Sequence, residues 1–365
     1  MVYLLKNLRV YSPKDLGLCD ILISNGVIYK IAQTGKIATP DWVEVTDCSN
    51  FIAFPGIIDA HVHIIGGGCE DGFNSRVIDI DSRDLFYAGV TTVVGVLGAD
   101  NQTKSLKSLY AKAKSLEDEG LTTYIYTGSY TLPLVTLTED ATTDMVLIDK
   151  VIGVGEVAIS DHRSSHPNVD DLLNISTKAY LGSLLSGKAG VVHLHLGDGK
   201  SRLESLNKVI EISDLPVDIF VPTHVNRNQH LFHDAIRYAK TTGNIDMTSG
   251  ERVGIDIPAA IETLLREGVD MTRVTISSDA NGTAPGGAIC TAYSLYRDTV
   301  RAILEKQISP EIAFKLVTEN VAKRLKLYPR KGVIAKGSDA DLLIVDGDYK
   351  LKKLIARGKF IINNN

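Results

Sequence analysis

The stretch "FPGIIDAHVH", residues 54–63, decides the fold class of this chain. It is a short run of apolar and β-branched residues that ends in polar side chains, a pattern typical of a buried strand in a parallel sheet. Similar runs follow it, separated by longer helix-like stretches. The eight runs are "FPGIID" (54–59), "GVTTVVGVL" (89–97), "TTYIYTGSY" (122–130), "GEVAIS" (155–160), "GVVHLHL" (190–196), "IFVPTH" (219–224), "NIDMTS" (244–249) and "VTISSD" (274–279). This alternation predicts βα units around a parallel sheet, and eight units in roughly 220 residues predict a TIM-like (β/α)8 barrel of the α/β class.

The two ends of the chain do not share this pattern. Residues 1–53 contain short alternating stretches interrupted by an Asn-Gly pair, which is a strong hairpin signal. The segment "GSDADLLIVDGDYKLKKLIARGKFII" (337–362) again contains short strand-like runs with turns. We therefore expect residues 1–53 and 329–365 to form one small β-sandwich domain beside a barrel of residues 54–328.

Composition limits the classes of function. The chain has 365 residues, of which 44% are hydrophobic, so it can bury a large core. Its 39 basic and 44 acidic residues give a net charge of −5 and form no basic block, which argues against a nucleic acid partner. The four cysteines form no CxxC pair, and no apolar run approaches the ~20 residues of a membrane helix. Without a signal-peptide pattern at its start, the chain is expected to be soluble and cytoplasmic, with no membrane partner.

Potential metal ligands stand at the ends of five of the eight expected strands. His61 and His63 are two residues apart, and the two-residue period of a strand points both side chains to the same side. The other strand ends carry Glu156, His195, His224 and Asp279. Because the carboxyl ends of barrel strands open onto one face, we expect all six side chains to meet there.

Each of these residues taken alone has an ordinary structural explanation. A single histidine at a strand end is usually a hydrogen-bonded structural residue, and we assign that role to His162, His166 and His193. A single buried carboxylate is usually paired with an arginine or with backbone amides. The convergence of four histidines and two carboxylates makes coincidence the weaker explanation. Their nitrogen and oxygen atoms suit zinc, with manganese, iron or cobalt as alternatives.

Several ordered blocks resemble a known family. They are "PGIIDAHVH", "DAHVHIIGGGCEDG", "VVGVLGAD", "TGSYTLP", "AISDHRS", "PTHVNRN" and "SSDANGT", followed by "GSDADLLIVD" near the end. Together they resemble the isoaspartyl (β-aspartyl) dipeptidase family of the amidohydrolase superfamily, over nearly the whole chain. The resemblance implies a homo-oligomeric metallopeptidase that cleaves the β-linked amide bond of small isoAsp-Xaa dipeptides with two zinc ions.

The resemblance also implies the ligands of each ion. His61, His63 and Asp279 match the residues that hold the first ion, while His195 and His224 match those that hold the second. The better-known family members bridge the two ions with a carboxylated lysine. In this sequence Glu156 stands at that position, and the nearest lysine, Lys150, precedes the strand. We expect Glu156 to replace the carboxylated lysine as the bridging carboxylate; the alternative is a site with one metal ion.

The family's mechanism assigns two catalytic residues. A hydroxide that bridges the two ions attacks the scissile carbonyl, and Asp279 takes its proton and passes it to the leaving amine. Tyr130 matches the tyrosine that donates a hydrogen bond to the developing oxyanion. For an isolated tyrosine, packing would be the ordinary role, so this assignment depends on the resemblance.

Substrate binding requires charges of defined sign. Glu70 matches the family residue for the substrate α-amino group, and Arg163 and Arg227 match its carboxylate-binding arginines. Thr283 stands where the family usually has serine. Two more departures, Cys69 for a glycine and Ala99 for a threonine, affect the expected substrate preference rather than the reaction type.

Two other functions remain open from the sequence. One is a different amidohydrolase reaction, on a cyclic amide or as a base deaminase, for which the charged residues just described have no use. The other is a metal-free, non-catalytic relative that keeps the fold, which the intact ligands at the non-bridging positions disfavour. The sequence leaves undetermined the physiological metal, the preferred C-terminal residue of the dipeptide and the oligomeric state.

Overall fold

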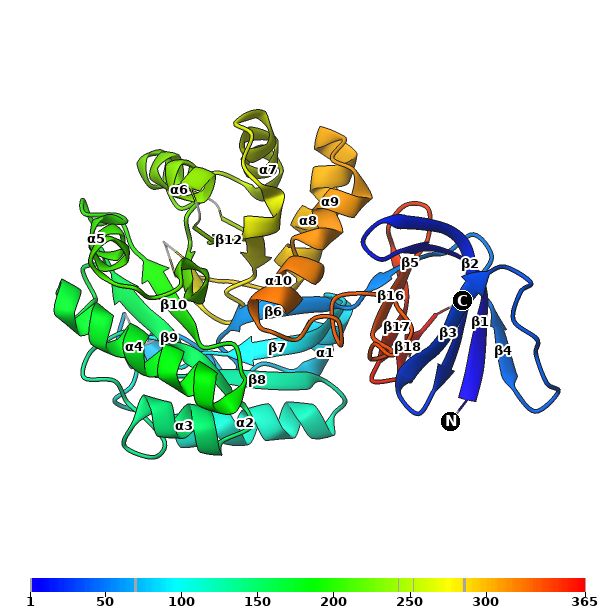
Figure 1. Cartoon of the computed structure of the whole chain (residues 1–365), viewed down its shortest axis with the longest axis horizontal. Helices are drawn as coiled ribbons and strands as arrows, with labels where there is room; N and C mark the ends of the chain where they lie inside the picture. The colour runs from blue at the N-terminus through cyan, green and yellow to red at the C-terminus, as the bar shows by residue number, and fades with distance from the viewer. Residues whose placement is uncertain (1, 69–70, 242, 252, 285–286, 365) are drawn as a thin grey trace.

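The computed structural model describes residues 2–68, 71–241, 243–251, 253–284 and 287–364. Figure 1 shows two parts side by side. The middle of the chain forms parallel strands with helices around them, and the two ends of the chain meet in a separate sheet. No helix among the described residues is long and apolar enough to cross a membrane.

The terminal sheet has eight strands in which β5 and β16 join the two ends of the chain. Its order is β18-β17-β16-β5-β1-β2-β3, with β4 paired to β1. The strands are β1 (Val2–Tyr11), β2 (Asp15–Ser24), β3 (Val27–Gln33), β4 (Glu44–Asp47), β5 (Ile52–Pro55), β16 (Leu342–Val345), β17 (Leu351–Ala356) and β18 (Lys359–Asn363). A core of its own contains Tyr3, Ile21, Leu342 and Ile355, so side chains from both ends of the chain are buried together.

The central part is a TIM-like half-barrel of six parallel strands in the order β11-β10-β9-β8-β7-β6, with a separate parallel pair, β12-β13. These strands are β6 (Ile57–Val62), β7 (Val90–Gly95), β8 (Thr122–Thr127), β9 (Val151–Ile159), β10 (Val191–Leu196), β11 (Phe220–Thr223), β12 (Ile245–Thr248) and β13 (Val274–Ser277). On the other side of the half-barrel, β12 contacts β11 and β13 contacts β6. Val62 also pairs in parallel with Ala280, just after β13.

The first expected strand, residues 54–59, is wrong in its extent. Phe54 and Pro55 belong to β5 of the terminal sheet, while Ile57 begins β6. Gly56 separates the two strands. This residue is a glycine because a Cβ here would lie 2.3 Å from Oγ1 of Thr91. The expected domain boundary after residue 53 therefore falls inside β5.

Helices occupy most connections between the parallel strands. They are α1 (Ser82–Tyr87), α2 (Leu106–Asp118), α3 (Ala141–Leu147), α4 (Val169–Ser186), α5 (Glu204–Ile212), α6 (Gln229–Thr241), α7 (Ile257–Arg266), α8 (Tyr293–Lys306), α9 (Pro310–Lys315) and α10 (Glu319–Arg324). Short 3-10 helices are η1 (Phe73–Ser75), η2 (Val217–Ile219) and η3 (Met271–Arg273), and β14 (Thr283–Ala284) pairs with β15 (Ala288–Ile289). The limits of α4 illustrate the local chemistry: Asn168 and Asp171 form a capping box at its start, and Gly187 ends it in the left-handed conformation.

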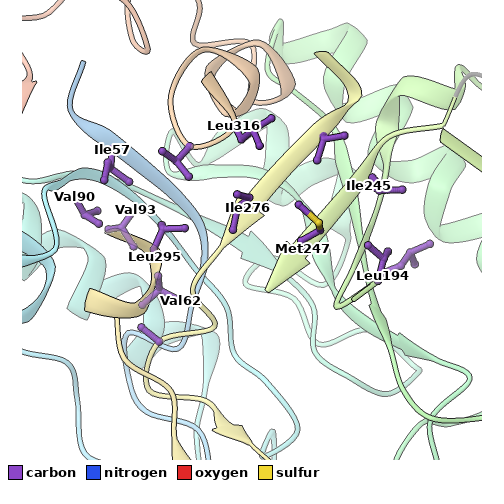
Figure 2. Packing of buried hydrophobic residues seen from close by; sticks show 14 of the residues in the cluster. Ile57, Val62, Val90, Val93, Leu194, Ile245, Met247, Ile276, Leu295 and Leu316 are labelled. Atoms are coloured by element: carbon purple, nitrogen blue, oxygen red, sulfur yellow. The ribbon is translucent and has the colours of Figure 1, made fainter. Parts of the chain in front are cut away.

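Apolar packing on both faces of the parallel strands explains why their sequences are so rich in valine and isoleucine. On the outer face, Val90 and Val93 pack in one cluster with Leu295 of α8 (Figure 2). A second cluster combines Ile58 and Val191 with Val321 of α10. Ile58 and Val191 stand at the amino ends of β6 and β10, so α10 packs at that end of the strands.

Candidate metal centre

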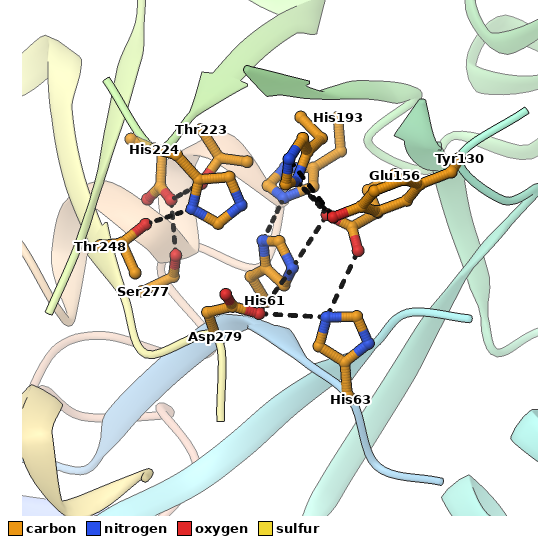
Figure 3. Close-up of polar contacts among 12 residues, drawn as sticks. His61, His63, Tyr130, Glu156, His193, Thr223, His224, Thr248, Ser277 and Asp279 are labelled. Atoms are coloured by element: carbon orange, nitrogen blue, oxygen red, sulfur yellow. Dashed lines mark hydrogen bonds and ion pairs between the residues drawn. The ribbon is translucent and has the colours of Figure 1, made fainter. Parts of the chain in front are cut away.

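The six proposed metal ligands lie in one buried group at the carboxyl ends of the parallel strands. Figure 3 labels five of them, His61, His63, Glu156, His224 and Asp279. The six come from β6 and the residue after it, from β9 and β10, and from the residues that follow β11 and β13. None is more than 8% exposed: His61, His63, Glu156, His195, His224 and Asp279. Side chains separated by more than 200 residues in the sequence are therefore neighbours in the fold.

Two carboxylates stand between the imidazoles. His61 Nε2 lies 3.2 Å from Glu156 Oε2 and 3.4 Å from Asp279 Oδ1. His63 Nε2 lies 3.3 Å from Glu156 Oε1 and 3.0 Å from the same Asp279 Oδ1. Each of the two carboxylates thus lies close to both His61 and His63.

The geometry contains two overlapping sets of three ligand atoms, in each of which all atoms lie within 4.8 Å of one another. One set is His61, His63 and Asp279, and the other is His61, Glu156 and His224. His195 belongs to neither compact set, although its Nδ1 lies 3.2 Å from Glu156 Oε2. The arrangement has enough donors for two cations close together.

Unsatisfied atoms provide a test of whether the residues fit metal ions. His61 Nε2, Glu156 Oε1, His224 Nε2 and Asp279 Oδ1 are buried and make no hydrogen bond of acceptable geometry. Leaving buried polar atoms unpaired is costly unless another partner satisfies them. Nitrogen and carboxylate oxygen donors of this kind are those that zinc prefers. The residues therefore fit a metal centre.

The electrostatics of the centre favour cations. Burial would lower the pKa of His61, but the adjacent Glu156 and Asp279 carboxylates raise it to about 9. Burial would likewise raise the pKa of Glu156, yet the surrounding imidazoles hold it well below its usual value. These opposite shifts show that the carboxylates set a negative potential at the imidazole nitrogens.

Tyr130 lies against the same group. Its hydroxyl is 2.8 Å from His195 Nδ1, and the side chain is almost fully buried at 5% exposure. Burial, followed by the nearby Glu156 carboxylate, raises the pKa of Tyr130 well above 10. The phenol therefore keeps its proton and is a hydrogen-bond donor across the physiological pH range.

Both proposed substrate arginines reach the pocket beside this group. One terminal nitrogen of Arg163 lies 3.3 Å from His195 Nε2, and one of Arg227 lies 3.2 Å from the same atom. The pocket lining also includes Ala99 and Thr283. Glu70 and Cys69 lie outside the described residues.

A family model described as "Amidohydrolase family" matches residues 52–363. The chain belongs to the amidohydrolase family. The crystal structure of a β-aspartyl dipeptidase from Fervidobacterium islandicum AW-1 is 40% identical, covers 100% of this chain and 98% of its own, and has a TM-score of 0.94. A structure of that dipeptidase in complex with β-Asp-Leu has the same identity and TM-score, and the match covers 100% of this chain and 97% of the other. The resemblance seen in the sequence is thereby confirmed.

A distant curated relative is much longer. Protein unc-33 of Caenorhabditis elegans is 21% identical over 96% of this chain, and this amidohydrolase chain spans 45% of its length.

Sequence reasoning assigned His193 a hydrogen-bonded structural role and gave Thr248 none; in the structure both contact histidine ligands of this amidohydrolase site. His193 Nε2 lies 2.9 Å from His61 Nδ1, and Thr248 Oγ1 lies 2.6 Å from His224 Nδ1. If the Nδ1 atoms of His61 and His224 carry the protons, their Nε2 lone pairs are left for a metal ion. The only sequence signal of the contact between His193 and His61 was the position of His193, two residues before the proposed ligand His195 in "HLH".

Asp161 is a further residue that the sequence did not single out. It is 3% exposed, and its carboxylate accepts hydrogen bonds from Arg163 Nε at 2.9 Å and Nη2 at 2.8 Å. Its Oδ2 also lies 3.2 Å from His195 Nε2. Burial opposes ionisation of Asp161, but the Arg163 hydrogen bonds hold its pKa far below the usual range. The Asp161 carboxylate stays ionised and thus orients both the Arg163 guanidinium and the His195 imidazole.

We expect Asp161→Asn to lower kcat/KM of this hydrolase by about 10–100-fold, the usual effect of losing an orienting contact next to a metal ligand. Most of this decrease should come from a higher KM, because Arg163 loses the carboxylate that accepts two of its hydrogen bonds. Steady-state kinetics on purified variants measure this. The matched control is Asp198→Asn at the pocket mouth, an exposed carboxylate, which should stay within about twofold of the parent. Equal kinetics for both variants would remove the role of Asp161.

Proposed function

We propose that this chain hydrolyses the β-aspartyl (isoaspartyl) peptide bond of isoAsp-Xaa dipeptides, as a metallopeptidase with two divalent metal ions, zinc being the expected one. The observation that carries the proposal is one pocket in which buried metal ligands and two arginines meet. The similarity to a dipeptidase whose structure was solved with β-Asp-Leu supports the substrate class.

The ligands divide between two ions. His61, His63 and Asp279 would hold one, His195 and His224 would hold the other, and Glu156 would bridge them. Such ions lower the pKa of a bound water and polarise a carbonyl group. A glutamate bridge needs no carbon dioxide to assemble, in contrast to a carboxylated lysine.

We assign the proton transfers of the reaction to Asp279. Its Oδ1 faces the imidazoles, whereas Oδ2 lies 4.0 Å from the Cys290 sulfur and away from them. Asp279 accepts a proton from the attacking water and donates it to the leaving amine, so it acts as general base and then as general acid.

Substrate binding uses the charges around the pocket. A β-aspartyl dipeptide carries two carboxylates and one ammonium group. Arg163 and Arg227 would bind the carboxylates through their planar guanidinium groups, Glu70 would bind the ammonium, and Thr283 would offer a hydroxyl. Cys69 and Ala99 would adjust the preference for particular dipeptides.

Tyr130→Phe should lower kcat about 10²–10³-fold with a smaller change in KM, because it removes one hydrogen bond to the oxyanion that forms in the transition state. Stopped assays with β-Asp-Leu measure both constants. The control is Tyr124→Phe, which should retain activity, because Tyr124 lies in β8, before the loop that carries Tyr130, and packs beside α10. A kcat unchanged by Tyr130→Phe would contradict the oxyanion role.

The proposal also includes the closure of the barrel and the limits of the two domains. We infer that β12 and β13 complete a closed (β/α)8 barrel with the six-stranded sheet, and that the terminal sheet curls into a β-sandwich. The domains would be residues 54–328 and residues 1–53 with 329–365, except that Phe54 and Pro55 belong to β5 of the terminal sheet. A reducing cytoplasm and a homo-oligomer complete the proposal; light scattering of the purified protein tests the latter.

A substrate panel tests the activity. The zinc-loaded protein is incubated with isoAsp-Leu, α-Asp-Leu, dihydrouracil and adenine, and products are separated by chromatography. We expect leucine to be released from isoAsp-Leu alone. Turnover of dihydrouracil or adenine instead would favour a cyclic amidohydrolase or a deaminase, and a protein that neither binds zinc nor acts on any of the four would be a non-catalytic relative.

A further inference from the structure

Strand β9 contains one residue more than its neighbour β10 at the position of Glu156. Val154 pairs with Val192, and the next pair is Val157 with Leu194. Between these pairs β9 contributes Gly155 and Glu156, whereas β10 contributes only His193. This two-against-one pairing is a β-bulge, a feature that redirects side chains and is frequent next to active sites.

The bulge requires glycine at its first position. Gly155 has φ of 154°, and a Cβ there would lie 2.7 Å from His193 Cβ and 2.9 Å from the His193 carbonyl oxygen. No other residue allows β9 to approach β10 this closely. Val154 and Val157, on either side, both belong to the outer apolar cluster. The two inserted positions therefore share the inner face of the strand.

The Glu156 carboxylate contacts histidines that belong to two different strands or their ends. It lies 3.2 Å from His195 Nδ1 on the adjacent β10. It also lies 3.2 Å from His61 Nε2 and 3.3 Å from His63 Nε2, although β6 is separated from β9 by β7 and β8 in the sheet. Only two methylene groups separate the carboxylate from the backbone, so the backbone itself has to project toward the centre.

We propose that Gly155 is a positioning residue: the β-bulge that it permits advances the Glu156 backbone so that one short carboxylate reaches the ligands of both metal ions. The inference rests on the proposed two-metal function. It explains how a glutamate serves where a longer bridging side chain is otherwise used.

Deletion of Gly155 tests the inference, because it restores one-to-one pairing and keeps Glu156. The deletion variant should stay folded by circular dichroism but bind the second zinc at least about tenfold more weakly. Zinc content after dialysis against graded free zinc, measured by mass spectrometry, gives this value without any activity assay. Val157→Ala is the control; it should lower the melting temperature and still hold two zinc ions.

A longer side chain should rescue the deletion. In the double variant, deletion of Gly155 with Glu156→Lys, the uncharged lysine Nζ attacks the carbon of carbon dioxide, forms an N–C bond and releases one proton, which leaves a carbamate. The second zinc should return in bicarbonate buffer and be lost without it. Two tightly bound ions in the single deletion, failure of the rescue, or loss of folding in both variants would each overturn the inference. A parent protein that binds fewer than two ions would contradict the proposed function instead.

Discussion

Asp279→Asn should reduce kcat for β-Asp-Leu by about 10²–10⁴-fold, the range typical of losing a general acid–base group. An asparagine keeps the size of the side chain and one oxygen that can face His61 and His63, but it cannot accept the proton of the attacking water. The substitution should therefore affect turnover much more than substrate binding. Single-turnover and steady-state kinetics with β-Asp-Leu separate the two.

The control for Asp279→Asn is zinc content. Oδ1 of Asp279 lies 3.0 Å from His63 Nε2, so the substitution also weakens one proposed ligand. We expect the variant to regain two zinc ions at raised free zinc without regaining turnover. If added zinc restores kcat to the level of the parent, Asp279 is a ligand only and the proton-transfer role is wrong.

Glu156→Gln and Glu156→Ala should each lose one of the two zinc ions and lower kcat by about 10³-fold or more, since the lost interactions amount to several kcal/mol. The glutamine keeps the shape of the side chain but removes the negative charge that two cations require. The carboxylate is completely buried, at 0% exposure, so solvent cannot replace it. Zinc analysis and kinetics on the same samples give both values.

An informative comparison is Asp144→Asn. Asp144 is also buried, and its carboxylate accepts hydrogen bonds from the backbone amides of Leu137 and Thr138 in the loop after β8. The substitution should destabilise the protein, because buried amides lose a charged acceptor, and it should leave two zinc ions bound. Should Glu156→Gln and Glu156→Ala both retain two tightly bound ions and full turnover, the bridging role of Glu156 would be disproved.

Much of the site follows from strand periodicity. The HxH spacing of His61 and His63 predicts that both point to one side, and the parallel order of the strands predicts that strand ends distant in sequence meet. The structure places all six proposed ligands in one buried group. What periodicity cannot predict is which ligand atoms come closest. His195 was expected to hold one ion together with His224, yet it lies outside both compact sets, and its ring contacts Glu156 and Asp161.

Local irregularities escaped prediction for a common reason. The division of residues 54–59 at Gly56 and the extra residue at Gly155 both depend on a close approach to another strand or side chain. Neither contact partner is adjacent in sequence, so no window of residues contains the information. Asp161 was missed in the same way: next to Arg163 it reads as a local ion pair, and only the fold brings it to His195.

A zinc titration of the metal-depleted protein, followed by the rate of leucine release from β-Asp-Leu, tests the central claim most directly. We expect no turnover without metal, a rise in rate with added zinc that saturates at two equivalents per chain, and no release from α-Asp-Leu at any point. Saturation at one equivalent, full activity without zinc, or cleavage of α-Asp-Leu at a comparable rate would contradict it.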